Sequence, residues 1–308
     1  MSRLDCPPGT PGEAPPTAEP SALAFAITEA PPGRSPRGRL RAGLAQVEPG
    51  LVLAVLVLAL AGLWALAPGL FTASDPLVGV PGQQLRPPGP DHLLGTDSLG
   101  RDLYARIVHG AVHSLSGALA AVAVGLLAGS ALGLLAGTLG GIADAAAMRF
   151  VDVLLSIPTL LLSLSIIIIL GFGTLNAALA VGATAVAGFA RLMRSEVVRV
   201  RRSEFVEAAF GSGGTVLAVL RRHILPNSLT SVLAFTALQF GWAILQISTL
   251  GFLGYGAPPP TPEWGLLIAE GRNYIATAWW LAAAPGAVVV VVVLAANRVG
   301  RAIGTARP

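Results

Sequence analysis

The chain contains 308 residues, of which 54% are hydrophobic and 12% are charged. Because about a quarter of the residues in soluble domains are charged, this composition excludes an ordinary soluble domain and predicts an integral membrane protein. All 20 basic residues are arginine. A phosphate-binding P-loop ends in Gly-Lys-Ser or Gly-Lys-Thr, so a chain without lysine cannot carry one.

Cysteine content and charge exclude further classes. Cys6 is the only cysteine, which excludes an intramolecular disulfide and a thiolate metal cluster. The isoelectric point is near 10.2, but the arginines flank apolar segments and are not interleaved with aromatic residues. The tendency of basic residues to stay on the cytoplasmic side of a membrane explains them more simply than nucleic-acid binding does.

Residues 1–45 are rich in proline, glycine, alanine and glutamate and show no apolar period, so we expect a disordered tail. A basic cluster lies late in this tail and consists of Arg34, Arg37, Arg39 and Arg41. A secretory signal peptide would instead begin with its basic residues. The cluster predicts that the N-terminus, and Cys6 with it, stays in the cytoplasm.

Six apolar segments can cross a bilayer as helices. They cover residues 51–67, 115–135, 151–170, 176–192, 229–253 and 281–296. A short inner turn is expected at 140–149, and Pro158 should kink the third span. Asp152, at the start of that span, is expected to cap the helix or to pair with Arg149. Glycines recur in the second span at 117, 125, 129 and 133, which predicts close helix packing.

The polar segment 70–110 lies outside in this arrangement, with a helix cap expected at Asp97 or Ser98 before the second span. His92, His109 and His113 fall in or near it. Histidines four residues apart can share a metal on a helix, but no third ligand stands at matching spacing. We therefore expect capping or interfacial roles for these histidines and no metal site.

Residues 204–228 form a polar island between apolar blocks. A short helix is expected at 204–210, a break at the glycine-rich run 211–214 and a second short helix at 215–223. Pro226 should end this helix, and Asn227 and Ser228 can cap the helix that follows.

This order of helix, glycine break, helix, proline and membrane span resembles the cytoplasmic loop of ABC-importer permease subunits. The residues that match the family's motif are Glu207, Ala208, Ala209, Gly213, Ile224, Leu225 and Pro226. In that family the loop forms a coupling helix that docks in a groove on a separate ATPase subunit, so the resemblance implies this role here. The alternative is an amphipathic loop that merely connects two spans.

The outer segment is similar to the signature of one branch of these permeases, the dipeptide, oligopeptide and nickel group. Its matching residues are Gly95, Thr96, Asp97, Gly100, Arg101 and Asp102. A second match follows the fifth span, where a proline-rich turn precedes Trp264 and the stretch Glu270-Gly271-Arg272.

The resemblance implies an all-α integral membrane fold, a six-helix transmembrane bundle of ABC-importer type with a cytoplasmic coupling helix. Its parts are a disordered tail at 1–45, the first span with an extracytoplasmic segment at 46–112, the permease core at 113–300 and a cytoplasmic tail at 301–308. The implied function is the translocation of di- or oligopeptides that an extracytoplasmic binding protein delivers, with nickel or another small solute as the alternative.

The implied partners are a second homologous permease subunit, two ATPase subunits, the solute-binding protein and membrane lipid. ATP and Mg²⁺ would act on the partner subunits, so no catalytic residue or cofactor is expected in this chain. Sixteen arginines lie on the inner side of the six-span arrangement and four on the outer side, Arg86, Arg101, Arg106 and Arg272. This bias predicts a plasma-membrane protein with both termini in the cytoplasm.

Gln239 and Gln246 lie on one face of the fifth span and are the best polar candidates for a lined pathway; hydrogen bonding between helices is the other open role. An ion-coupled carrier is a different class of function, and it normally needs ionisable groups near mid-membrane. No span has one at its centre. A membrane-embedded enzyme is disfavoured because the sequence has no HExxH or GxSxG motif and no paired intramembrane aspartates.

Overall fold

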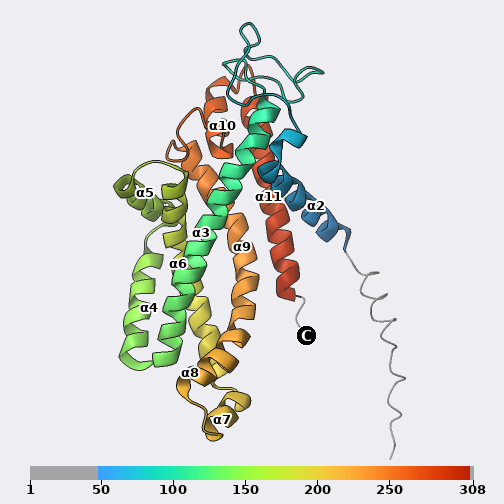
Figure 1. Cartoon of the computed structure of the whole chain (residues 1–308). Helices are drawn as coiled ribbons and strands as arrows, with labels where there is room; N and C mark the ends of the chain where they lie inside the picture. The colour runs from blue at the N-terminus through green and yellow to red at the C-terminus, as the bar shows by residue number, and fades with distance from the viewer. Residues whose placement is uncertain (1–47, 306–308) are drawn as a thin grey trace, which may run out of the picture. The chain divides into compact units, whose positions relative to one another are not determined.

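The computed structural model describes residues 48–305 (Figure 1). The predicted disordered tail, with Cys6 and its arginine cluster, lies outside these residues. The long helices are α2 (Pro49–Leu66), α3 (Leu103–Leu139), α4 (Gly141–Ser156), α5 (Thr159–Leu170), α6 (Thr174–Arg201), α9 (Leu225–Phe252) and α11 (Trp280–Thr305). The short elements are η1 (Pro68–Leu70), α7 (Glu204–Gly211), α8 (Val216–Val219), η2 (Leu220–Ile224), α10 (Trp264–Gly271) and η3 (Arg272–Tyr274).

Five helices of the described part are long and apolar enough to cross a membrane, and the count rises to six if the pair α4 and α5 is one broken span. These two helices meet at an angle of 96°. The break confirms the kink expected at Pro158, but it is much sharper than a kinked span implies. Ile157 has an extended backbone with φ −91° and ψ 129°, the conformation that a following proline favours.

The prediction of an inner turn at 140–149 is wrong, because most of this stretch is helical. Gly140 and Gly141 alone make the turn, with φ of 66° and 55°, and α4 begins at once. Side chains of α4 pair with α6: Arg194 Nη2 donates to Asp144 Oδ2 at 2.6 Å, and Arg191 Nη2 donates to Asp152 Oδ1 at the same distance. Asp152 therefore pairs with Arg191 rather than with Arg149.

Helices α3 and α6 pack closely along a row of glycines. A Cβ at Gly133 would lie 2.3 Å from the Ala190 carbonyl oxygen and 2.8 Å from the Met193 Cβ, and a Cβ at Gly129 would lie 2.5 Å from the Val186 carbonyl oxygen. Backbone therefore touches backbone here, which confirms the close packing expected from the glycine spacing. Figure 1 shows the two helices running side by side.

Two helix boundaries differ from the expected ones. The second span starts at Leu103 rather than 115, because Asp102, and not Asp97 or Ser98, caps it: Asp102 Oδ1 accepts from the Ala105 N–H at 2.8 Å. The boundary expected between residues 112 and 113 therefore falls inside α3. At the other end of the chain α11 continues through residues 297–304, past the predicted end of the last span.

Pro226 does not end a helix, which corrects a second expectation. The chain passes from α8 through the π-helical turn η2 into α9, and Pro226 lies in the first turn of α9. The Leu225 N–H bonds to the Leu220 carbonyl, one residue further back than in an α-helix. This wider turn accommodates the proline. Asn227 does not cap the helix that follows. Its side-chain amide donates backward, to the His223 carbonyl at 2.6 Å.

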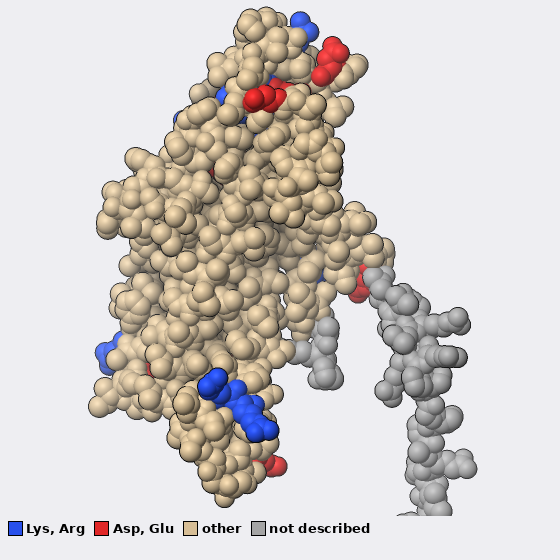
Figure 2. Space-filling model, in the orientation of Figure 1, with Lys and Arg blue, Asp and Glu red and all other residues tan. Residues whose placement is uncertain are grey.

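The two ends of the described unit differ. One end carries the loop of residues 71–102 and α10, and the opposite end carries α7 and α8 (Figure 1). Charged side chains gather toward these ends, and the broad middle of the face in Figure 2 is almost uncharged. Such a band is what a bilayer requires.

The α3–α6 contact can be tested with matched glycine substitutions. Gly133→Ala should destabilise the fold by about 1–3 kcal/mol, because the added methyl overpacks a backbone contact. Gly62→Ala in α2 is the control, since a Cβ there meets nothing within 4 Å, and it should leave stability unchanged or slightly raised. Thermal unfolding of the purified chains in detergent measures both. Equal midpoints for the two variants would contradict the close contact.

Candidate functional site

The polar island folds as two short helices around a glycine turn. Val206 on α7 and Val219 on α8 are buried, and they anchor the two helices. Gly213 has φ +86°, a left-handed backbone that side chains other than glycine's rarely adopt. The Gly214 N–H closes the turn by bonding to the Ala209 carbonyl at 3.1 Å. A Cβ at Gly214 would lie 2.7 Å from that carbonyl oxygen, so this second glycine is needed for close approach.

The outward side of this segment is apolar. Phe205 on α7 is 48% exposed, and Val216 and Leu217 on α8 are 69% and 64% exposed. Glu207 and Arg221, close by in the sequence, are exposed as well. Large apolar side chains exposed next to charged ones at the tip of a protein favour an interaction surface.

The predicted coupling residues do not all face the same way. Glu207 and Ala208 are exposed on α7, Gly213 is exposed in the turn, and Pro226 is exposed at the start of α9. The remaining members point inward to different degrees: Ala209 and Leu225 are half-buried, and Ile224 is buried. The structure therefore separates an exposed group on α7 and the turn from an inner group at the base of α9.

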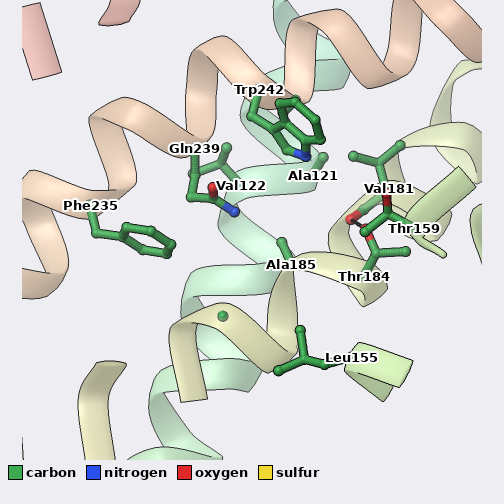
Figure 3. A pocket seen from close by; sticks show the side chains of 12 residues that line it. Ala121, Val122, Leu155, Thr159, Val181, Thr184, Ala185, Phe235, Gln239 and Trp242 are labelled. Carbon is green, nitrogen blue, oxygen red and sulfur yellow. Dashed lines mark hydrogen bonds between the residues drawn. The ribbon is translucent and has the colours of Figure 1, made fainter. Parts of the chain in front are cut away.

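A cavity of about 180 Å³ lies between α3, α6, α9 and the junction of α4 with α5. Figure 3 shows Phe235, Gln239 and Trp242 projecting from α9 toward Val181 and Thr184 of α6, with Thr159 beside them. The lining residues include no acid, arginine or histidine. The cavity thus offers a neutral wall of apolar groups with two threonine hydroxyls, one amide and one indole.

The two glutamines predicted for a pathway occupy different environments. Gln239 is half-buried and lines the cavity. Gln246 is 4% exposed, does not line it, and its Nε2 has no hydrogen-bond partner among the described residues. The other role considered for these residues was hydrogen bonding between helices. The amide nitrogen of Gln246 makes no such bond among the described residues.

At the opposite end, an ion cluster holds the outer signature to α3 and α10. Asp97 Oδ2 accepts from Arg101 Nε at 2.6 Å and from Arg106 Nη1 at 2.8 Å. Arg106 Nη1 also donates to Glu270 Oε2 at 2.5 Å. Asp97, Arg101 and Arg106 are each at most 5% exposed. Arg101 is therefore a buried structural group and does not project from the surface.

The rest of the signature has structural roles as well. Thr96 and Asp102 pair as an isolated antiparallel bridge. Gly95 and Gly100 have φ of +78° and +77°, so both take the left-handed backbone that favours glycine. His92 bridges the loop, with Nδ1 2.8 Å from Asp102 Oδ2 and Nε2 2.7 Å from Gln83 Oε1. The described residues contain no group of three potential metal ligands.

Glu263 is a structural residue for which no role was predicted. It is 1% exposed and caps α10, because its side chain accepts from the N–H groups of Gly265 at 2.9 Å and Leu266 at 3.0 Å. Ser114 of α3 donates to it at 3.2 Å. Burial raises the pKa of the Glu263 carboxyl, and these hydrogen bonds offset part of the rise. A weaker signal was present, because acidic side chains are favourable near the N-terminus of a helix, although glutamate is not a preferred N-cap residue.

Substitution in the ion cluster should be costly. Arg106→Gln removes a buried cation shared by Asp97 and Glu270, and breaking such a pair costs about 3–5 kcal/mol. Arg86→Gln is the control, because Arg86 is exposed and lies in the loop of residues 71–102, outside the ion cluster. Thermal unfolding of the detergent-solubilised chains should show a large drop in midpoint for the first variant only. Equal midpoints would show that the cluster contributes little.

Comparisons with known proteins agree with the architecture. The sequence model of the family described as "Binding-protein-dependent transport system inner membrane component" matches residues 129–306. The dipeptide transport system permease protein DppC of Alkalihalophilus pseudofirmus is 38% identical over 237 residues, which cover 77% of this chain and 78% of that protein. The di/tripeptide transport system permease protein DppC of Pseudomonas aeruginosa is 40% identical over 214 residues, which cover 70% and 71% of the two chains.

A solved structure, entitled "Inward facing conformations of the MetNI methionine ABC transporter", superposes with a TM-score of 0.52 at 19% identity and covers 64% of this chain and 96% of that chain. At this identity the match shows a shared fold. Together with the family match over more than half of the sequence, these findings identify the protein: the chain belongs to the family of inner membrane components of binding-protein-dependent transport systems, the permease subunits of ABC importers.

Proposed function

We propose that this permease carries di- or oligopeptides into the cell and that α7, the glycine turn and α8 transmit the state of an ATPase to the transmembrane helices. The observation that carries the second part is the exposed apolar surface of Phe205, Val216 and Leu217. The names of the relatives from Alkalihalophilus pseudofirmus and Pseudomonas aeruginosa, both peptide permeases, support peptides over nickel as the substrate.

The absence of lysine from the sequence gives this contact its importance. The chain has no P-loop, so it can respond to ATP only through contact with another subunit. ATP and Mg²⁺ act on ATPase partners in this proposal, and no residue of this chain is catalytic. Glu207, Ala208 and Gly213 form the exposed part of the contact. Ala209, Ile224, Leu225 and Pro226 connect it to the base of α9.

The arginine distribution supports an orientation. The α7–α8 end lies among Arg194, Arg199, Arg202 and Arg221, so we place this end and both termini in the cytoplasm. The ion cluster with Asp97 and Arg101 then faces the outside. We infer that the folded outer signature, through exposed residues such as Leu99, meets the binding protein. Leu99 is 60% exposed.

The complete transporter in this proposal holds a second similar permease chain and two ATPase subunits, besides the binding protein. The cavity lined by Gln239 is part of the substrate path. A neutral wall suits a peptide that must leave as well as enter, because no fixed charge holds either terminus. Gln239 supplies hydrogen bonds to peptide groups, while the buried Gln246 serves only packing.

The coupling role can be tested at two glycines of the same turn. Gly213→Val forces a β-branched residue into a left-handed backbone at a cost of about 1–2 kcal/mol, which should re-aim α7. Co-purification of the ATPase and peptide uptake should fall together. Gly211→Val is the control, because Gly211 has no positive φ and a Cβ there meets nothing within 4 Å. Full ATPase association and uptake in the Gly213→Val transporter would refute the coupling role.

The path can be tested with a matched pair in α9. Gln239→Leu should reduce peptide uptake by roughly tenfold, the equivalent of losing one or two hydrogen bonds to the passing substrate, without loss of ATPase association. Gln246→Leu should leave uptake unchanged, because this amide does not line the cavity. Uptake assays with a labelled dipeptide in vesicles measure both. The proposed path would be wrong if only Gln246→Leu reduced uptake.

A further inference from the structure

A long apolar groove between α2 and α11 has no role in the proposed transport path. Two cavities lie along it, of about 360 Å³ and 210 Å³. Both are lined by Val57 of α2 and Val291 of α11, so they form one continuous groove. Figure 1 shows α2 diverging from α11 toward the N-terminal end of α2, and the larger cavity, which includes Gly50, lies at that end.

The groove has two chemically different ends. Its walls are apolar, with Leu53, Ala54 and Leu294 around the larger cavity. Arg298 and Arg301 line the same cavity at the C-terminal end of α11. The smaller cavity reaches Trp64. One end therefore presents guanidinium groups, and the remainder presents hydrocarbon.

A phospholipid matches this pattern in length and charge. From Gly50 to Trp64 a helix rises by about 21 Å, and one leaflet of the hydrocarbon core is about 15 Å thick, so the groove can hold an acyl chain over the whole depth of a leaflet. Hydrocarbon is the chemistry that suits these apolar walls. Arginine binds phosphate through paired N–H groups, which would fix the head group at Arg298 and Arg301.

We propose that the groove between α2 and α11 is a binding site for an anionic phospholipid, with the head group on Arg298 and Arg301 and one acyl chain along Val57 and Val291. Glu48 tunes the site. Its carboxylate pairs with Arg298, and it is 68% exposed at its side chain. An anionic head group competes with this carboxylate for Arg298. Removal of the Glu48 charge therefore strengthens lipid binding.

Native mass spectrometry of the purified full chain tests the site, with phosphatidylglycerol and phosphatidylcholine of identical acyl chains added at equal concentration. The wild-type chain should retain phosphatidylglycerol in preference to phosphatidylcholine, and each arginine should contribute about fivefold to that preference. Arg298→Gln and Arg301→Gln should reduce it, whereas Glu48→Gln should increase it. Arg149→Gln is the control, because Arg149 is exposed on α4, outside the groove; it should change nothing.

A second variant separates the groove from the head-group site. Val291→Trp fills the groove without a backbone clash, since Val291 is 48% exposed, and it should reduce retention of both lipids. Three results with the purified chain alone would overturn the proposal: equal retention of the two lipids by the wild-type chain, an equal loss of preference in Arg149→Gln, or unchanged retention in Val291→Trp. Loss of the lipid when the second permease subunit is present would equally overturn it, because the groove would then be a protein interface.

Discussion

The contact between the backbones of α3 and α6 is the constraint on which the arrangement of the other helices depends. Lipid tails are as apolar as leucine side chains, so the hydrophobic effect does not drive helices together inside a membrane. Helices there associate through close packing instead. Glycines at 125, 129, 133 and 137 let α3 meet α6 closely. Because α6 leads into α7 and α3 begins at the signature segment, this one contact sets the distance between the two ends of the described unit.

Each end is attached to this pair by a different kind of interaction. At the signature end Arg106 of α3 pairs with Asp97 of the signature and with Glu270 of α10. Ser114 and Glu263 add a second connection between α3 and α10. At the other end α7 and α8 are anchored by two buried valines and leave most of their apolar surface exposed. The signature end is thus held by ion pairs within the chain, whereas the α7–α8 end leaves large apolar side chains exposed.

Local patterns in the sequence predicted local structure well. Pro158 indicated a break, the glycine run 211–214 indicated the turn between α7 and α8, and the glycine spacing in α3 indicated a close contact. The prediction that Pro226 ends a helix was wrong because a π-helical turn lets the helix continue. No residue type indicates such a turn. Arg106 and Glu270 are 164 residues apart, so their pairing could not be read from spacing. Gln239 and Gln246 share a helix face, and only the packing around them decides which one meets the cavity.

Cross-linking from opposite ends of the chain tests the central claim most directly. Cys6 is the only cysteine, so in a Cys6→Ser background Val216→Cys and Leu99→Cys each present a single thiol on an exposed side chain; Val216 is 69% and Leu99 60% exposed. In the assembled transporter a thiol-reactive cross-linker should join Val216→Cys to the ATPase and Leu99→Cys to the binding protein. Attachment of Val216→Cys to the binding protein, or of Leu99→Cys to the ATPase, would contradict the account.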